Sequence, residues 1–142
     1  MTVRLAMQSD SEAISALNVE LGYEPSEQLV ATRLDRLQHD PEHAVYVFED
    51  SMCGIVGWLH VHATHRIESE TFAEIGGLVV AAASRRVGVG TQLVTTAAEW
   101  SASMNYGKLR VRCNALRAEA LAFYTAIGFT PSKQQQILDR LL

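Results

Sequence analysis

One stretch of the chain, residues 78–91, reads Leu78-Val79-Val80-Ala81-Ala82-Ala83-Ser84-Arg85-Arg86-Val87-Gly88-Val89-Gly90-Thr91. It starts as the apolar end of a strand-like segment and finishes with two glycines ahead of a segment with helical spacing. A strand, a glycine-containing loop and a helix in this order gather backbone N–H groups at the helix start. Glycine lets the backbone approach an anion, and the positive end of the helix dipole favours negative charge. The stretch therefore predicts a site for a phosphate or diphosphate.

This loop differs from two common nucleotide-binding loops. It lacks the Lys-Ser/Thr ending of a P-loop, which argues against hydrolysis of a magnesium-bound nucleotide. It also lacks the third glycine of the dinucleotide fingerprint and follows a late strand rather than the first. Arg85 and Arg86 supply further donors at the rim of an anion site. Two spaced glycines taken alone are equally consistent with a structural turn.

The rest of the chain alternates strand-like and helix-like segments. Period-two patterns predict strands over residues 2–7, 44–48, 55–63, 72–80 and 109–113. Helical spacing predicts two helices before residue 40, the first with a capping box of Ser9 and Glu12, and two more over residues 91–103 and 119–127. The apolar end, residues 134–142, is expected to return as a final strand, with a helix as the alternative. The order predicts one α/β (α+β) domain, residues 1–142, whose mixed sheet has six to seven strands flanked by about four helices.

Composition and charge narrow the class of protein. Of 142 residues, 48% are hydrophobic and 20% charged, as in globular domains. The net charge of −4 argues against nucleic acid as a partner. No stretch reaches the roughly 18 apolar residues of a membrane span, and residues 1–10 lack a signal-peptide core, so we expect no membrane partner and a cytoplasmic location. Cys53 and Cys113 fit no metal or redox spacing and are expected to be free thiols.

Two segments of the chain resemble the signatures of the GCN5-related N-acetyltransferase (GNAT) superfamily. The first is Arg85-x-x-Gly88-x-Gly90, preceded by Glu74-Ile75-x-x-Leu78-Val79-Val80. The second runs from Asn114 through Arg117, Glu119, Ala122 and Phe123-Tyr124 to Gly128-Phe129. The order of elements is similar over essentially the whole chain, although Arg86 stands where many members carry glycine. The resemblance implies a GNAT-like fold with a mostly antiparallel sheet that binds acetyl-coenzyme A (acetyl-CoA).

The resemblance also implies which residues bind the cofactor. In the family, the pantetheine arm pairs with the strand edge before the loop, and the loop amides bind the pyrophosphate. Cofactor contacts then fall on Leu78, Val79, Val80, Arg85, Arg86, Val87, Gly88, Val89, Gly90 and Thr91, with Asn114 near the pantetheine arm or the acetyl end. Gly76 and Gly77 interrupt the preceding strand, which favours a bulge or close backbone approach, or tight packing under Trp58. No metal is implied.

The implied activity is transfer of the acetyl group to a primary amine by direct attack in a ternary complex. The resemblance makes Tyr124 the proton donor to the departing thiolate, and the phenol pKa of about 10 suits that role; a core aromatic is the alternative. Glu74 is the matching candidate base. An ordinary glutamate is a poor base for an ammonium, because their pKa values, about 4.3 and about 10.4, differ by about six units. Glu74 must therefore have a raised pKa, act through water or orient a neutral amine; the alternative is a strand carboxylate paired with Arg110 or Arg112.

Other features leave the acceptor open. His60 and His62 share one face of a strand, but no four-ligand zinc spacing is readable, so we expect them to line the acceptor pocket or face solvent. The acceptor is a small-molecule amine, an aminoglycoside, an amino acid or a protein N-terminus. A homodimer is expected if Leu141 and Leu142 cover a partner's edge strand. Two other classes remain: a non-catalytic acyl-CoA sensor, and a structural or partner-binding domain.

Overall fold

The computed structural model describes all 142 residues and divides into two compact parts. The larger part, Met1–Val111, contains the whole sheet and three α-helices. The smaller part, Arg112–Leu142, contains one α-helix, α4 (Ala118–Ala126). The four α-helices confirm the predicted number, whereas one domain over residues 1–142 stays a prediction. No helix is long and apolar enough to cross a membrane.

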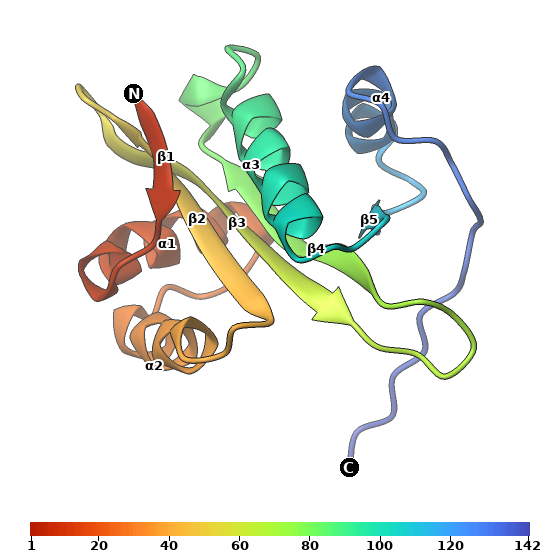
Figure 1. Cartoon of the computed structure of the whole chain (residues 1–142). Coiled ribbons are helices and arrows are strands. Elements are labelled where there is room, and N and C mark those ends of the chain that lie inside the picture. The colour runs from red at the N-terminus through yellow and green to blue at the C-terminus, as the bar shows by residue number, and fades with distance from the viewer. The chain divides into compact units, whose positions relative to one another are not determined.

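The sheet has five strands in the order in which they occur along the chain (Figure 1). These are β1 (Thr2–Leu5), β2 (His43–Asp50), β3 (Gly54–Thr64), β4 (Phe72–Val80) and β5 (Leu109–Val111). The first four pair antiparallel, and β5 runs parallel to β4. A mixed, mostly antiparallel sheet is thus confirmed, but six to seven strands is wrong.

The missing element is the predicted strand over residues 134–142. No helix or strand follows α4, and Leu138, Leu141 and Leu142 are exposed. A strand forms only where a neighbouring strand completes its hydrogen bonds, and the smaller part contains no other strand. The apolar sequence of residues 134–142 was therefore not sufficient to predict a strand.

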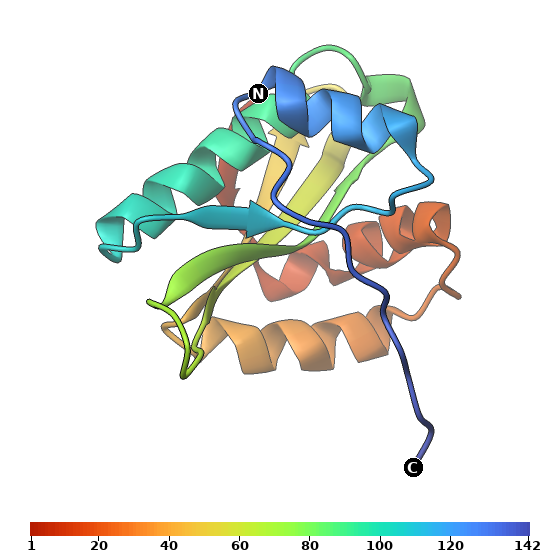
Figure 2. The ribbon, with the colours of Figure 1, turned by 90° about the vertical axis from the view of Figure 1, so that its right-hand side faces the viewer.

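Helices cover both faces of the sheet in the larger part. Helices α1 (Ser11–Asn18) and α2 (Glu27–Gln38) lie on one face, and α3 (Val89–Ser103) lies on the other (Figures 1 and 2). On the first face the core contains Ile14, Val30, Leu34, Val45 and Val47. The α3 residues at helical spacing, Val89, Leu93, Val94 and Ala97, are buried, which fits the predicted amphipathic pattern.

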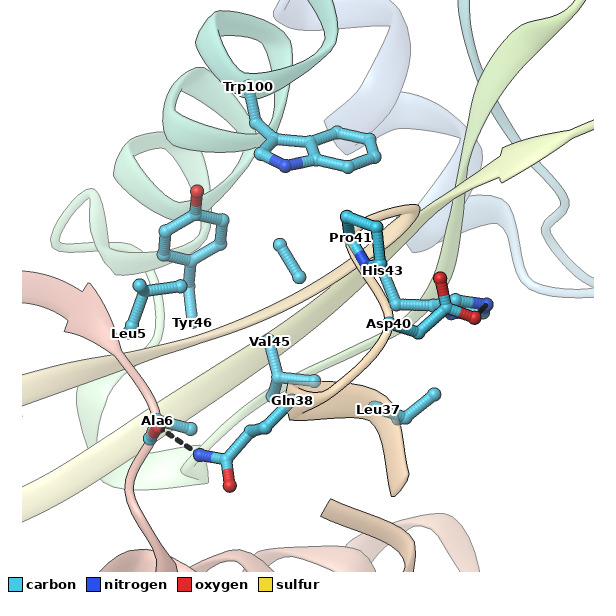
Figure 3. Close-up of a pocket in the computed structure, with 11 residues that line it drawn as sticks. Leu5, Ala6, Leu37, Gln38, Asp40, Pro41, His43, Val45, Tyr46 and Trp100 are labelled. Atoms are coloured by element: carbon cyan, nitrogen blue, oxygen red, sulfur yellow. Dashed lines mark hydrogen bonds and ion pairs between the residues drawn. The ribbon is translucent and has the colours of Figure 1, made fainter. Parts of the chain in front are cut away.

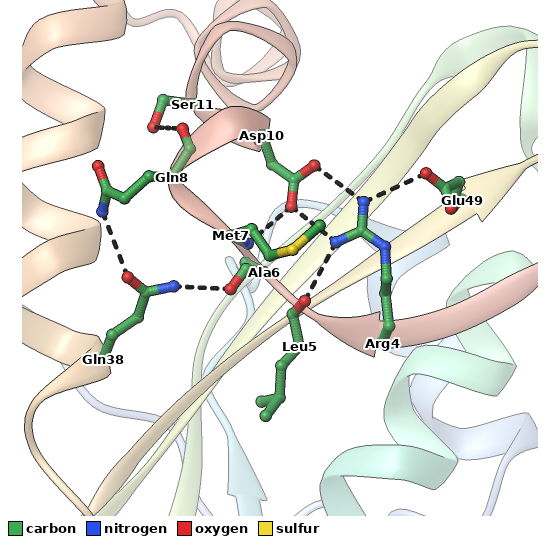
Figure 4. Close-up of polar contacts among 9 residues, drawn as sticks. All are labelled: Arg4, Leu5, Ala6, Met7, Gln8, Asp10, Ser11, Gln38 and Glu49. Atoms are coloured by element: carbon green, nitrogen blue, oxygen red, sulfur yellow. Dashed lines mark hydrogen bonds and ion pairs between the residues drawn. The ribbon is translucent and has the colours of Figure 1, made fainter.

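The N-terminal turn is built around a buried carboxylate, that of Asp10 (Figure 4). The Arg4 guanidinium donates to both Asp10 oxygens, at 2.8 and 3.0 Å, and to Glu49 at 3.2 Å. The Met7 N–H also donates to Asp10, at 2.7 Å. A 3-10 turn, η1 (Gln8–Asp10), therefore precedes α1, and the predicted capping box of Ser9 and Glu12 is wrong because Asp10 accepts the orphan amide at this end.

Strands β3 and β4 shift register at a bulge. His60 lies opposite Gly77 and Val61 opposite Ile75, so Gly76 is the extra residue. A Cβ on Gly76 would lie 2.9 Å from Nδ1 of His60, and a Cβ on Gly77 would lie 2.7 Å from the Trp58 ring. Both interpretations of the glycine pair, a bulge and packing under Trp58, are confirmed.

Candidate active site

The connection between β4 and α3 is anchored to the neighbouring strand. The Ala81 N–H donates to the Val56 carbonyl at 2.8 Å, and the 3-10 turn η3 (Ala82–Ser84) follows. On Gly57 of β3, a Cβ would lie 3.2 Å from the side chains of both Val89 and Leu93. The missing side chain therefore lets the start of α3 pack closely against β3, which fixes the loop at the end of β4.

The backbone of this loop leaves a run of donors without acceptors. None of the N–H groups of residues 86–91 donates to an acceptor within the chain, and the first such bond runs from Gln92 to the Gly88 carbonyl at 3.0 Å. Gly88 is the N-cap of α3, with φ of 90°, and no atom lies within 4 Å of a Cβ built there. Six free amides at the N-terminus of a 15-residue helix fit a diphosphate group.

The two loop arginines differ in their contacts. Arg85 donates to the Val80 carbonyl at 3.1 Å and to Glu20 at 3.0 Å, and the second Glu20 oxygen accepts the Ala82 N–H at 3.2 Å. Arg85 thus stabilises the loop, and its predicted contact with an anion stays a prediction. Arg86 is exposed, has φ of 64° and forms no ion pair within the chain, which leaves its guanidinium available.

Glu20 was missed at the sequence level. It lies in the 3-10 turn η2 (Val19–Leu21) that follows α1, 62 positions before Ala82. No spacing rule relates such distant positions, because the folded sheet alone brings them together. A glutamate next to the turn at Gly22 carries no local signal of this contact.

A small cavity lies between α1, α2 and the sheet. Its volume is about 140 Å³, and we name it the inner cavity. Apolar side chains of both helices line it together with Asn18, Arg33, Trp58 and His60. The Trp58 indole N–H donates to the Asn18 side chain at 3.0 Å, which holds the ring over Gly77. The inner cavity therefore adjoins the β4 bulge through Trp58 and His60.

Three histidines gather on this face of the sheet. The ring centres of His43, His60 and His62 lie 5.2 to 5.4 Å apart, and Nδ1 of His43 lies 2.9 Å from Nε2 of His60. Burial, with the nearby His62 and His43, lowers the pKa of His60 to about 4, so the ring is neutral at pH 7. No group of three or more His, Cys, Asp or Glu side chains is arranged to hold a metal ion.

His60 lines the inner cavity, whereas His62 is not among its lining residues. That the two histidines line an acceptor pocket stays a prediction. His43 was missed, although a signal for it existed. It begins β2 and precedes Val45 and Val47 at period-two spacing, which places all three side chains on one face.

Glu74 lies on β4, on the same face as the histidines. It is half-buried and stands in register with His62 on one side and Arg110 on the other. Paired residues of neighbouring strands project to the same face, so Glu74 lies next to the histidine cluster. Its action as a base stays a prediction.

A second hollow of about 400 Å³, which we name the outer cavity, lies along β2 beyond the end of β1 (Figure 3). Tyr46, Trp100, Asp40 and His43 contribute to its lining. The Gln38 amide closes one side by donating to the Ala6 carbonyl at 2.6 Å. No residue of the loop 81–91 lines the outer cavity, so we do not assign it to the cofactor.

The two remaining candidates belong to the smaller part. Tyr124 on α4 is buried, with its ring centre 5.0 Å from that of Phe123 and 5.4 Å from that of Phe129. Burial, and to a smaller extent the nearby Cys113, raises the pKa of Tyr124 to about 12, so the phenol is protonated at pH 7. The Asn114 side-chain oxygen accepts the Leu116 N–H at 2.9 Å. Association of Tyr124 and Asn114 with the loop stays a prediction.

Comparison with known families decides what kind of protein this is. A sequence model described as the acetyltransferase (GNAT) family matches residues 11–129. The chain belongs to the GNAT family. The predicted resemblance is therefore confirmed, and the chain is a member of a family of acetyltransferases.

Solved structures show the same fold. A transcriptional regulator from Bacillus halodurans C-125 is 22% identical to this GNAT chain, with a TM-score of 0.87, over 98% of this chain and 99% of the other. The aminoglycoside N-acetyltransferase AAC(6')-Iy in complex with CoA is 13% identical, with a TM-score of 0.84, over 99% and 100%. The aminoglycoside 6'-N-acetyltransferase AAC(6')-Ih from Acinetobacter baumannii is 14% identical, with a TM-score of 0.84, over 99% and 98%. A comparison with curated protein sequences gives no match.

Proposed function

We propose that this GNAT chain is an acetyl-CoA-dependent N-acetyltransferase that acetylates a primary amine by direct transfer in a ternary complex. The observation that supports it best is the run of six acceptor-free amides, residues 86–91, at the start of α3. A solved neighbour with the same fold is a complex with CoA. When bound, acetyl-CoA supplies an acetyl thioester that is activated toward attack by an amine.

The proposed binding residues for acetyl-CoA lie in the loop before α3, on β4 and in the smaller part. The amides of residues 86–91 bind the diphosphate, with Arg86 beside them. The edge of β4 at residues 78–80 pairs with the pantetheine arm, and the Asn114 side chain donates to it. Arg85 acts by holding the loop in shape through Glu20 and Val80. The proposal assigns no metal to this site.

Two side chains handle protons in the proposed reaction. Tyr124 donates its phenolic proton to the departing thiolate, and its raised pKa keeps that proton in place at pH 7. Glu74 orients the amine or acts through water, because an ordinary carboxylate is about six pKa units too acidic to deprotonate an alkylammonium directly.

The proposed acceptor is a small-molecule amine that enters through the inner cavity. Two of the similar structures are aminoglycoside N-acetyltransferases, which supports a small-molecule acceptor. We also propose that the protein is cytoplasmic and forms a homodimer.

One observation supports a second candidate function. The similar structure from Bacillus halodurans C-125 is described as a transcriptional regulator. In a regulator of this kind, the loop of residues 86–91 would bind acyl-CoA as a signal, without transfer to an amine. Such a sensor would bind acyl-CoA without releasing free CoA, whereas the enzyme releases CoA at each transfer.

Binding and turnover measured on the same protein separate these functions. Calorimetry with CoA and acetyl-CoA tests the loop, and thiol release with a panel of alkylamines, amino acids, peptides and aminoglycosides tests transfer. We expect binding, amine-dependent thiol release and an acetylated product detected by mass spectrometry. Binding without thiol release would support the sensor, and no binding would contradict both functions.

A further inference from the structure

The two cavities of the larger part are joined by a pair of histidines. His60 lines the inner cavity, and His43 lines the outer cavity. Nδ1 of His43 lies 2.9 Å from Nε2 of His60, a hydrogen-bond distance. The planes of the two rings are nearly parallel, at an interplanar angle of 20°, which suits a hydrogen bond between ring nitrogens. A hydrogen-bonded pair thus connects a small cavity at the β4 bulge with a wide hollow at the edge of the sheet.

The ring nitrogens outside this hydrogen bond point to opposite ends of the pair. Nδ1 of His60 faces the β4 bulge, and Nε2 of His43 faces Asp40. Nδ1 of His60 lies against the bulge, 2.9 Å from where a Cβ on Gly76 would stand, and only glycine leaves this approach open. Nε2 of His43 lies 3.7 Å from a carboxylate oxygen of Asp40, which also lines the outer cavity. Figure 3 shows Asp40 and His43 side by side at that cavity. The ring nitrogens of His60 and His43 thus form a continuous chain from the β4 bulge to the half-exposed carboxylate of Asp40.

The charged groups around the pair come from four elements. The His62 ring of β3 lies beside both rings, stacked with that of His43 and tilted by 39° against that of His60, and Glu74 of β4 stands in register with His62. Arg33 of α2 shares the inner cavity with His60, and Asp40 of the connection after α2 faces His43. Helix α1 contributes only Ile14 and Asn18 to the inner cavity. Burial and the neighbouring His62 and His43 rings favour the neutral form of His60.

We propose that His60 and His43 form a relay that carries the proton of the acceptor ammonium from the inner cavity to the outer cavity; this inference rests on the proposed acetyltransferase function. The ammonium N–H bond breaks, and its proton binds Nδ1 of His60. The proton on Nε2 of His60 passes to Nδ1 of His43, and the proton on Nε2 of His43 passes to water or Asp40. One proton leaves, the amine keeps the electron pair, and neither ring is oxidised or reduced. Water that enters after the product leaves restores the starting tautomers.

The relay gives the proton a path out of the inner cavity, which a single base with a pKa near 4, whether a carboxylate or His60 alone, does not. A deprotonated nitrogen is needed at the bulge at pH 7, and the pKa of His60, about 4, keeps that ring neutral. Such a ring does not store a proton, so it must pass the proton on while it accepts one. His43, which is closer to solvent and to Asp40, is the group that receives it.

His43→Phe tests the relay, because it keeps an aromatic ring at this position and removes the onward nitrogens. With saturating acetyl-CoA and the best alkylamine of the panel, we expect kcat at pH 7 to fall by about 10²-fold, a magnitude typical of lost acid–base catalysis. The loss should shrink as the pH rises toward the amine pKa, because a neutral amine has no proton to give. The KM for acetyl-CoA should not change, and added imidazole should restore part of the turnover. His39→Gln, on an exposed histidine at the end of α2, should leave the pH profile unchanged.

The outcomes separate the relay from the proposed function. A pH-independent loss in His43→Phe, or no loss at all, overturns the relay while amine-dependent turnover of the unsubstituted protein preserves the function. CoA binding with no thiol release from the unsubstituted protein overturns both.

A second measurement needs no variant and no turnover. In long-range ¹H–¹⁵N NMR spectra of the imidazoles, we expect His60 and His43 to share one slowly exchanging N–H proton and His60 to stay neutral down to about pH 5, since its pKa is about 4. Two rapidly exchanging, independent rings would overturn the relay even if His43→Phe fails to fold.

Discussion

The carboxylate of Glu20 bridges two points of the loop between β4 and α3, since one oxygen lies 3.0 Å from the Arg85 guanidinium and the other 3.2 Å from the Ala82 N–H. Glu20 belongs to η2, at the start of the connection between α1 and α2. That connection borders the helices that line the inner cavity. The segment beside the proposed acceptor cavity and the loop proposed to bind the cofactor are therefore linked by a single side chain.

Glu20→Ala should weaken CoA binding by about fivefold, because an exposed ion pair contributes up to about 1 kcal/mol to ordering the loop. Calorimetric titration with CoA measures the effect. Glu12→Ala, which removes an equal charge from an exposed position on α1, should leave the Kd unchanged. Equal Kd values for all three proteins would show that Glu20 does not order the loop.

Gly88→Ala should both destabilise the protein and impair CoA binding. The free energy of unfolding should fall by about 1–2 kcal/mol, because Gly88 has φ of 90° and a Cβ disfavours this left-handed conformation. The Kd for CoA should rise about tenfold or more, since strain and added bulk arise where a phosphate would approach. Urea unfolding and calorimetry provide the two measurements.

Gly107→Ala is the matched control for Gly88. Gly107 is also surrounded by open space, but its φ is not in the left-handed region. The substitution should leave CoA binding intact and change stability by no more than about 1 kcal/mol. If Gly88→Ala behaves like Gly107→Ala in both measurements, the loop conformation is not needed for binding.

Local parts of the site could be predicted from the sequence, and distant contacts could not. The strand, loop and helix around Gly88 follow from neighbouring residues, so their order and the bulge at Gly76 were predicted correctly. The contact of His43 with His60 depends on the register of β2 and β3, which includes a shift between Phe48 and Glu49. A slip of one residue would move His43 to the opposite face, so the pattern alone does not determine the pair.

The C-terminal error has a related cause. Ile137, Leu138, Leu141 and Leu142 gave an apolar pattern that a strand would share, yet all four are exposed. The local apolar pattern shows which side chains a segment can bury. A strand also needs the edge of a neighbouring strand, and the local sequence does not show whether such an edge is available. The capping box predicted at Ser9 and Glu12 was wrong for a similar reason. Asp10 accepts the amide hydrogen bond at this helix end because Arg4, on β1, binds its carboxylate, and the local sequence does not show that contact.

Tyr124→Phe should lower kcat by about 10²-fold or more and leave the Kd for CoA unchanged, because only the proton donor is removed. The pKa of about 12 predicts that the unsubstituted protein keeps this donor protonated throughout the range from pH 7 to 10. Tyr106→Phe, which removes a hydroxyl from the ring that packs against Trp100, serves as the control. Unchanged kcat in Tyr124→Phe would remove Tyr124 from the mechanism.

Asp10→Asn should destabilise the protein in a pH-dependent manner. Burial raises the pKa of Asp10, but hydrogen bonds from Arg4 and the Met7 N–H outweigh it, so the net pKa lies below its usual value. A lowered pKa in the folded state gives stability that is present above the unfolded pKa of about 3.9 and lost as the pH falls through the folded pKa. We expect a loss of about 2–3 kcal/mol in urea unfolding at pH 7, as for hydrogen bonds to a charged group, and a smaller loss at pH 3. Asp35→Asn, on a carboxylate that is 66% exposed, should change stability by less than about 0.5 kcal/mol at both pH values, and an equal loss for Asp10→Asn at pH 7 and pH 3 would contradict the assigned charge on Asp10.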